Sequence, residues 1–139
     1  MIIVDTNVLS EAMREVPAER VVAWLEAQRS SEDFTTAITK AEVLFGIEIL
    51  PQGRSRARLT AAAELIFSQS FVGRVLAFDE DAAKHFAQIA ASLRSQGRVT
   101  SEADVQIAAI ARAHVATLAT RNVRHFNECG IQLVNPWQS

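Results

Sequence analysis

The chain has 139 residues, of which 49% are hydrophobic and 22% are charged, and its formal net charge is −2. These values are typical of one globular domain spanning residues 1–139, and the net charge gives no signal for a partner that binds through the overall charge of the protein. No stretch approaches the roughly 18 apolar residues of a membrane span. A single cysteine, Cys129, excludes an internal disulfide and suits the reducing cytoplasm, where we expect the protein to act.

Five short apolar runs predict the strands of a sheet. The runs are continuous rather than alternating, and several are rich in β-branched residues, as in strands that are buried on both faces. The predicted strands are Ile2–Val4, Phe34–Ile38, Arg74–Phe78, Val115–Thr120 and Ile131–Val134.

Between these runs the apolar residues recur at helical spacing. The predicted helices are Pro17–Gln28, Thr39–Leu50, Arg54–Ser70, Asp81–Gln96 and Ser101–His114. Asp79 is suited to cap the start of the fourth helix, and Gly97 is suited to close it. Strands that alternate with helices in this way predict an α/β fold with a mainly parallel sheet covered by helices.

Four polar residues fall where such a fold places a ligand site. Asp5 directly follows the first strand, and Asn122 follows the fourth. Glu42 and Asp104 each lie in the first turn of a predicted helix. Open parallel sheets bind ligands outside the carboxyl ends of their strands. If the first, second and fourth strands are neighbours, these residues converge on one edge of the sheet.

Each acid also has a purely structural interpretation. TKAE at 39–42 and SEAD at 101–104 both match a capping box, and Asp5 is a candidate cap for a short helix that begins near Asn7. Three carboxylates placed together, however, repel one another and raise each other's pKa. A hard divalent cation removes that penalty, and Mg²⁺ or Mn²⁺ prefers oxygen ligands. We therefore predict a Mg²⁺ or Mn²⁺ site held by all three acids.

A carboxylate-held metal favours one class of reaction. It activates a bound water and neutralises charge on a phosphoryl oxygen, so the pattern favours a metal-dependent nuclease. A glycosidase needs two carboxylates with separate roles, and the sequence contains no recognisable pair of this kind. A receiver domain has a pair of acids after its first strand, and a haloacid-dehalogenase-like phosphatase has Asp-x-Asp there, where this chain has Asn7. A further alternative is a non-catalytic binding module whose acids only cap helices. Such a module would show no tight Mn²⁺ site.

Four blocks of sequence resemble those of PIN-domain ribonucleases. They are DTNVLSE at 5–11, TKAEVLFG at 39–46, SEADVQIAAIA at 101–111 and TRNVRHF at 120–126. Their order and spacing, together with the closing NPW at 135–137, resemble VapC-type toxins and particularly the FitB-like branch. The resemblance covers essentially the whole chain.

This resemblance implies a three-layer PIN-like domain with a mainly parallel five-stranded sheet flanked by helices. It implies Mg²⁺- or Mn²⁺-dependent cleavage of RNA by the toxin of a type II toxin–antitoxin system. The implied catalytic and metal-binding residues are Asp5, Glu42 and Asp104. Thr6 and Thr120 are implied to support them by hydrogen bonds. A homodimer is implied as well, with a VapB- or FitA-like antitoxin whose C-terminal segment occupies the active-site groove.

Two positions depart from many relatives, which carry a fourth acid in place of Asn122 and an aspartate in place of His125. Asn122 can still support the site by hydrogen-bonding to a metal-bound water, but the site carries one negative charge less. We therefore expect one well-held ion, with a second recruited by the substrate. The alternative is a non-catalytic or weakly active PIN-like partner that binds DNA or RNA beside an antitoxin-type transcriptional regulator. Arg121 and Arg124 flank the end of the fourth strand, where they are placed to meet phosphate.

Overall fold

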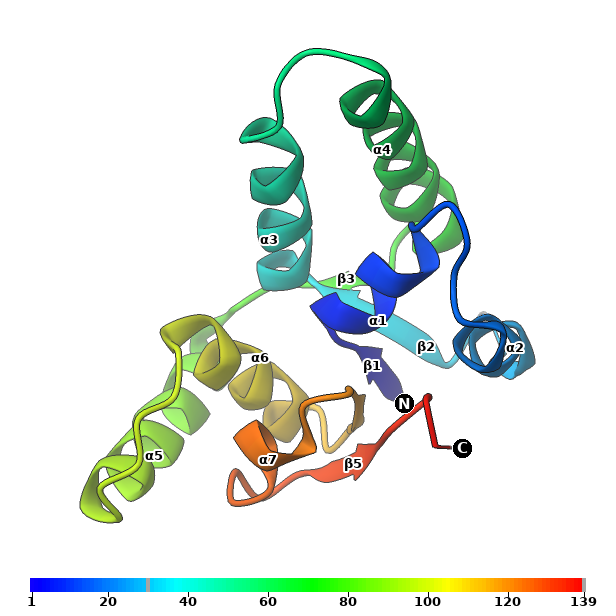
Figure 1. Ribbon diagram of the computed structural model, residues 1–139. Coiled ribbons are helices and arrows are strands. Elements are labelled where there is room, and N and C mark those ends of the chain that lie inside the picture. Colours follow the sequence, from blue (N-terminus) through cyan, green and yellow to red (C-terminus); the bar gives the residue numbers. More distant parts are fainter. Residues whose placement is uncertain (30, 139) are drawn as a thin grey trace.

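The structure, a computed structural model, describes residues 1–29 and 31–138. Within these ranges five strands form one sheet in the order β3–β2–β1–β4–β5, and all neighbouring pairs are parallel (Figure 1). The strands are β1 (Ile2–Val4), β2 (Asp33–Thr36), β3 (Val75–Leu76), β4 (Thr117–Ala119) and β5 (Gln132–Val134). The predicted α/β fold with a parallel five-stranded sheet is confirmed.

Helices cover both faces of this sheet. They are α1 (Thr6–Ala12), α2 (Glu19–Ala27), α3 (Ala37–Glu48), α4 (Arg54–Leu65), the π-helical turn η1 (Ile66–Ser70), α5 (Glu80–Ser95), α6 (Glu102–Ala113) and α7 (Val123–Phe126). Successive residues of β1 point to opposite faces. Ile3 is fully buried in a core with α5 and α6, and Val4 is fully buried in a second core with α1, α2, α3 and α4. The three-layer arrangement follows from these two cores.

The strand order places a topological switch point at β1. From β1 the chain adds β2 and β3 on one side, and it then returns to add β4 and β5 on the other. Ligands bind at such a point, outside the carboxyl ends of the strands that flank it. The β1–β4 pairing extends one residue past β1, because the backbone N–H of Asp5 donates to the carbonyl of Ala119 at 3.0 Å. Asp5 and Thr120 therefore leave the sheet side by side.

Several helix ends agree with the sequence. Asp79 caps α5, where its Oδ1 accepts from the N–H of Ala82 at 3.0 Å, and Gly97 follows the helix with a φ of 69°. Ser101 caps α6, as its Oγ accepts from the N–H of Asp104 at 3.1 Å. Among the described residues, no helix is both long and apolar enough to cross a membrane.

Other boundaries differ from the prediction for local reasons. Thr36, not Thr39, caps α3, because its Oγ1 accepts from the Thr39 N–H at 3.0 Å; the predicted strand therefore stops at Thr36 and no capping box forms at 39–42. Val115 has a φ of 51°, in the left-handed region, so β4 begins at Thr117 and not at Val115. The predicted helix over 54–70 continues to its end, but its last turn is π-helical.

Candidate functional site

Asp5 lies at the end of β1 and caps the start of α1, with only 3% of its surface exposed. Its Oδ1 accepts from the backbone N–H of Thr6 at 2.8 Å. Its Oδ2 accepts from the hydroxyl of Thr120 at 2.8 Å and from the side-chain amide of Asn7 at 3.1 Å. A buried carboxylate needs such donors, because burying it without partners is costly.

The surroundings of Asp5 nevertheless favour its protonated form. Burial is the largest cause and raises its pKa from 3.8 to about 6. The hydrogen bonds from Thr120 and Thr6 act in the opposite direction, and the negative charges of Asp104 and Glu42 raise the pKa further. A buried acid beside two other acids is an arrangement that a bound cation would stabilise, and perturbed acids of this kind cluster at functional sites.

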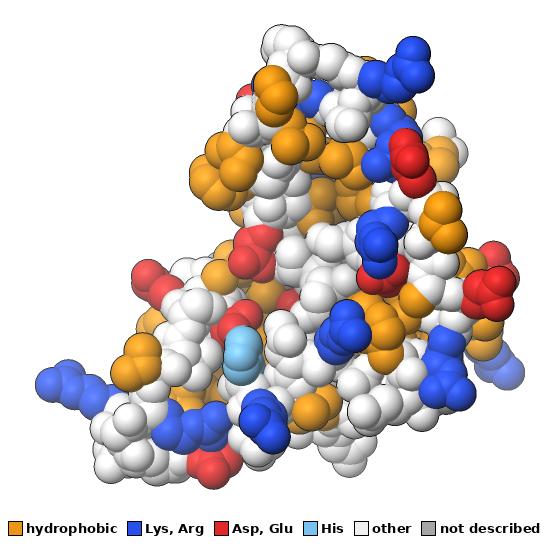
Figure 2. Space-filling view, viewed as in Figure 1, with side chains coloured by type: hydrophobic (Ala, Val, Ile, Leu, Met, Phe, Trp, Pro, Cys, Tyr) orange, Lys and Arg blue, Asp and Glu red, His pale blue; other side chains and the backbone are white. Residues whose placement is uncertain are grey.

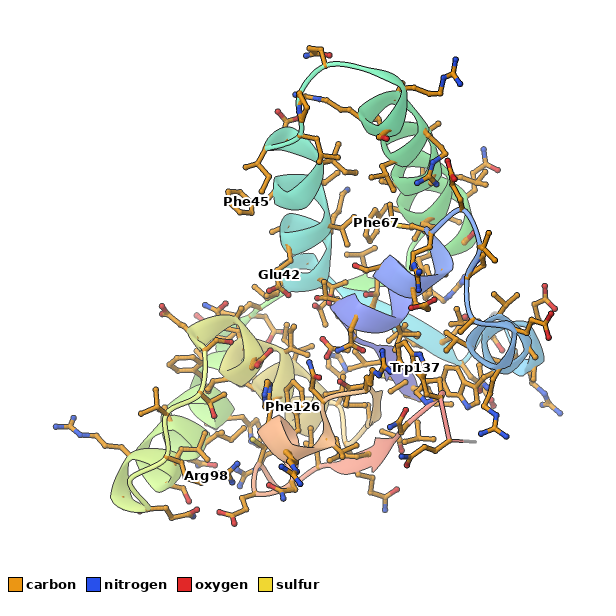
Figure 3. The ribbon with its side chains drawn as sticks, viewed as in Figure 1. Glu42, Phe45, Phe67, Arg98, Phe126 and Trp137 are labelled. Atoms are coloured by element: carbon orange, nitrogen blue, oxygen red, sulfur yellow. The ribbon has the colours of Figure 1, made fainter. Side chains whose placement is uncertain are left out.

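Glu42 is exposed on α3 and is connected to Asp5 through Thr6. The hydroxyl of Thr6 donates to Glu42 Oε1 at 2.6 Å and lies 3.1 Å from the hydroxyl of Thr39, while its backbone N–H donates to Asp5. Figure 3 shows Glu42 at the end of α3 nearest the sheet. The alternative interpretation of Glu42 as part of a capping box does not hold, because α3 begins two residues before Thr39 and Thr36 supplies its cap.

Asp104 enters the same region from the first turn of α6. Only its backbone N–H takes part in the cap with Ser101, and its carboxylate Oδ2 lies 3.2 Å from Nδ1 of His125. His125 belongs to the four-residue helix α7 that follows β4, and its side chain is about half exposed. The carboxylate of Asp104 thus contacts α7 rather than its own helix start, and its negative charge acts on Asp5.

Thr120 and Asn7 hold the centre of this network. The Thr120 hydroxyl is fully buried; besides donating to Asp5, it accepts from the Asn7 amide at 3.2 Å and from the backbone N–H of Asn122 at 3.0 Å. Asn7 in turn accepts at Oδ1 from the backbone N–H of Arg121 at 3.0 Å. Asn122 therefore supports the site through its backbone, and within the described part of the chain no hydrogen bond of its side-chain amide is found.

Sequence reasoning missed Asn7 as a member of the site. The sequence gives Asn7 no role in the site, whereas the structure shows that it joins the ends of β1 and β4 across the switch point. The signal was its place in the DTN block directly after Asp5. Thr39 was missed for a similar reason, because its hydroxyl was assigned to a cap that does not form.

The donor set suits a hard cation. Asp5, Glu42 and Asp104 offer carboxylate oxygens, which are the ligands that Mg²⁺ and Mn²⁺ prefer. In the ranges that the structure describes, no group of three or more His, Cys, Asp or Glu side chains is gathered closely enough to hold a metal by itself. Mg²⁺ typically keeps several of its waters and takes only one or two carboxylates, so the residues fit it. The metal-binding roles of the three acids stay a prediction.

A hollow beside Glu42 borders the site. A hollow of about 320 Å³ opens between α1, α3 and α4, and Glu42 forms part of its wall. Its other walls include Met13, Arg14, Val43, Arg58 and Leu59.

The Cys129 thiol is buried in the core of the α5–α6 face, and burial raises its pKa, which disfavours the reactive thiolate.

The family model described as PIN domain matches residues 2–130 of this chain. The chain belongs to the PIN-domain family. This PIN domain is 38% identical over 138 residues to the VapC ribonuclease Y4jK of Sinorhizobium fredii, and 39% identical over 137 residues to the toxin FitB of Neisseria gonorrhoeae. In both comparisons 99% of each chain is covered.

A solved structure of FitAB bound to an IR36 DNA fragment superposes on this PIN domain with a TM-score of 0.90. The two chains are 39% identical, and the comparison covers 99% of this chain and 96% of that one. The resemblance to VapC-type toxins of the FitB-like branch, predicted from four short blocks, is confirmed by these relatives.

Proposed function

We propose that this PIN domain is a metal-dependent endoribonuclease of the cytoplasm and the toxin of a type II toxin–antitoxin system. The observation that carries the proposal is Asp5, a buried carboxylate at the switch point of the sheet with a raised pKa and two further acids nearby. Capping α1 does not require so costly a residue, whereas binding a cation does. Its relatives, a VapC ribonuclease and the toxin FitB, support RNA as the substrate and toxicity as the role.

In the proposed mechanism Asp5 and Asp104 would be the primary ligands of Mg²⁺ or Mn²⁺, and Glu42 would be a further ligand or would orient a water. When bound, the ion lowers the pKa of a water and neutralises charge on the phosphodiester oxygen. Thr120 holds Asp5 Oδ2, and Thr6 holds both Asp5 Oδ1 and Glu42 Oε1, so the carboxylates are oriented before the ion arrives. Orientation of this kind tunes metal affinity.

We infer that one ion is held well and that a second arrives with the substrate. Asn122 is neutral where many relatives have an acid, so the site lacks one charge that a second ion would use. A Mn²⁺ titration of the free protein tests this point. One tight site is the expected result, and two equally tight sites would contradict it.

The antitoxin is proposed to place its C-terminal segment in the hollow between α1, α3 and α4. This hollow combines apolar walls from Met13, Val43 and Leu59 with the charges of Arg14 and Arg58, and it adjoins Glu42. A peptide bound there would lie against Glu42 and hinder access of RNA from this side. A solved relative, FitB in the FitAB complex, supports a partner protein of this kind.

A homodimer is proposed on the outer side of α3. Phe45 on α3 and Ile49, the residue that caps the end of α3, are 66% and 67% exposed, and Leu44 precedes Phe45 on the helix. Figure 2 shows hydrophobic side chains gathered on this side of α3, and in Figure 3 Phe45 points away from the domain. Large apolar side chains that are exposed together are typical of an interface.

The test is cleavage of a mixed structured RNA by the antitoxin-free protein in Mn²⁺ or Mg²⁺. EDTA and Asp5→Asn are the controls, and both should abolish cutting. Cutting that persists in EDTA or in Asp5→Asn would refute the site. A wild-type protein that binds Mn²⁺ but cuts no RNA would instead favour the alternative role beside a DNA-binding antitoxin, as in the FitAB–DNA structure.

A further inference from the structure

One feature of the chain is not used by the carboxylate site. Arg121 lies in the loop between β4 and α7, and Trp137 lies in the tail that follows β5. The Arg121 guanidinium carbon is 4.8 Å from the centre of the Trp137 ring, within the range of a cation–π contact. The NPW block, which sequence analysis noted without a role, thus meets the TRN block in space.

Trp137 is held in place by two hydrogen bonds of its backbone and by packing of its ring. Its backbone N–H donates to Oδ1 of Asn135 at 2.9 Å, and its carbonyl accepts from Arg20 on α2 at 3.0 Å. The half-buried ring packs against the core beneath α1 and α2. Trp137, labelled in Figure 3, is therefore a fixed surface on which a guanidinium can rest.

Arg121 is connected to the acids through its backbone. Its N–H donates to Oδ1 of Asn7, and the amide of Asn7 donates to Oδ2 of Asp5. Two hydrogen bonds thus separate the backbone of Arg121 from the most buried carboxylate of the site. The position of Arg121 is set by the same network that orients Asp5.

The charge of Arg121 is available to a ligand. Within residues 1–29 and 31–138 its exposed guanidinium has neither an ion pair nor a hydrogen bond, whereas Arg14, Arg58 and Arg98 each pair with a glutamate. A guanidinium held over an aromatic ring without an ion pair or hydrogen bond keeps N–H groups for a ligand, and its planar fork matches the geometry of phosphate. The chain has a net charge of −2, so an RNA that approaches three acids needs a local cation.

We propose that Arg121, held on Trp137, is a phosphate-binding subsite that positions RNA beside the carboxylate site. The inference rests on the proposed function for its substrate class and adds where the RNA backbone is held. Arg121 binds a phosphate next to the bond that is cut, and Trp137 fixes the guanidinium in the orientation for binding.

The primary test measures binding of a fluorescent single-stranded RNA of mixed sequence in EDTA, where no cleavage occurs, at several salt concentrations. Arg121→Gln should weaken binding about tenfold, the loss expected for one charge-assisted contact. The dependence of log affinity on log salt should also become shallower by about 0.7, as for one phosphate contact on a single strand. The matched control is Arg94→Gln, which removes an exposed arginine from α5 and should change affinity less than about twofold.

Two more variants test the Trp137 ring and the charge of Arg121 separately. Trp137→Leu should weaken binding by a smaller factor than Arg121→Gln, because the cation remains but is no longer held. Arg121→Lys should keep the salt dependence and lose part of the affinity, since it keeps the charge without the planar fork. Equal affinities and salt dependences for Arg121→Gln and Arg94→Gln would overturn the proposal, as would a wild-type protein that binds no RNA at low salt.

Cleavage assays separate this subsite from the proposed function. With Mn²⁺, Arg121→Gln should raise KM about tenfold and change kcat little, and its affinity for Mn²⁺ should equal that of the wild type. RNA binding that depends on Arg121 in a protein that never cleaves would leave the subsite standing and refute the ribonuclease. Cleavage with a KM that Arg121→Gln leaves unchanged would support the ribonuclease and refute the subsite.

Discussion

Replacing Asp5 with asparagine should stabilise the metal-free protein at neutral pH, although it should abolish activity. Burial raises the pKa of Asp5 from 3.8 to about 6, so above about pH 6 the native state carries a charge that its surroundings disfavour. A difference of about 2 pKa units corresponds to roughly 3 kcal/mol. Asparagine has nearly the same shape and removes this cost.

The sign follows from proton binding. The native carboxyl binds its proton more tightly than the unfolded one, so its stabilising contribution is complete below about pH 3.8 and is lost as the pH rises through about 6. Asp5→Asn has no such loss. The unfolding free energy of the variant relative to the wild type should therefore rise by about 2–3 kcal/mol between pH 4 and pH 7.5.

Part of this gain is offset by hydrogen bonds. The carboxylate accepts from Thr6, Thr120 and Asn7, and an amide in its place loses one or two of these bonds at about 1 kcal/mol each. The net stabilisation of Asp5→Asn at pH 7.5 should therefore be about 1–2 kcal/mol.

The assay is urea unfolding in EDTA, followed by circular dichroism from pH 4 to pH 8 for both proteins. Adding Mn²⁺ should then stabilise only the wild type, because a ligand raises stability through its affinity for the native state. A difference between variant and wild type that does not change with pH would refute the reasoning, as would a variant that is less stable at pH 7.5.

Three further predictions concern other parts of the chain. Thr120→Val should destabilise the protein by about 1–3 kcal/mol and raise the pKa of Asp5 further, because buried partners lose their hydrogen bonds; urea unfolding and the pH dependence of stability measure the two effects. Val115→Gly should raise stability by about 1 kcal/mol in thermal unfolding, since Val115 is 92% exposed and has a left-handed φ. Phe45→Glu with Ile49→Glu should convert a dimer to a monomer in light scattering, and an unchanged mass would contradict the α3 interface.

The sheet could be predicted from sequence because its strands are buried on both faces. Apolar runs marked the five strands. Asp5 at the end of the first strand, and Glu42 and Asp104 at helix starts, indicated the site edge. The sequence did not predict the strand order. That the first, second and fourth strands are neighbours was only a condition for the acids to converge, because strand order depends on helix packing that periodicity does not report. The structure meets that condition, with β2 and β4 on either side of β1.

The local errors have physical causes of their own. Thr36 and Thr39 both suit a helix cap, and sequence alone does not say which hydroxyl reaches an N–H three residues on. α7 has four residues, too few for a helical period, so the contact between His125 and Asp104 was not predicted. Asn7 was missed for a different reason, because two of its hydrogen-bond partners, Thr120 and Arg121, lie more than a hundred residues away in the chain.

The most direct test of the account is a titration of Mn²⁺ into the free protein, with unbound ion measured by electron paramagnetic resonance. The three acids should form one site, so Glu42→Gln should weaken Mn²⁺ binding by about tenfold or more. Glu64→Gln, a matched change at an exposed glutamate of α4, should leave it unchanged. A wild-type protein that binds no Mn²⁺ would contradict the claim that these acids hold a metal, and equal binding by Glu42→Gln and the wild type would contradict the part given to Glu42 in holding it.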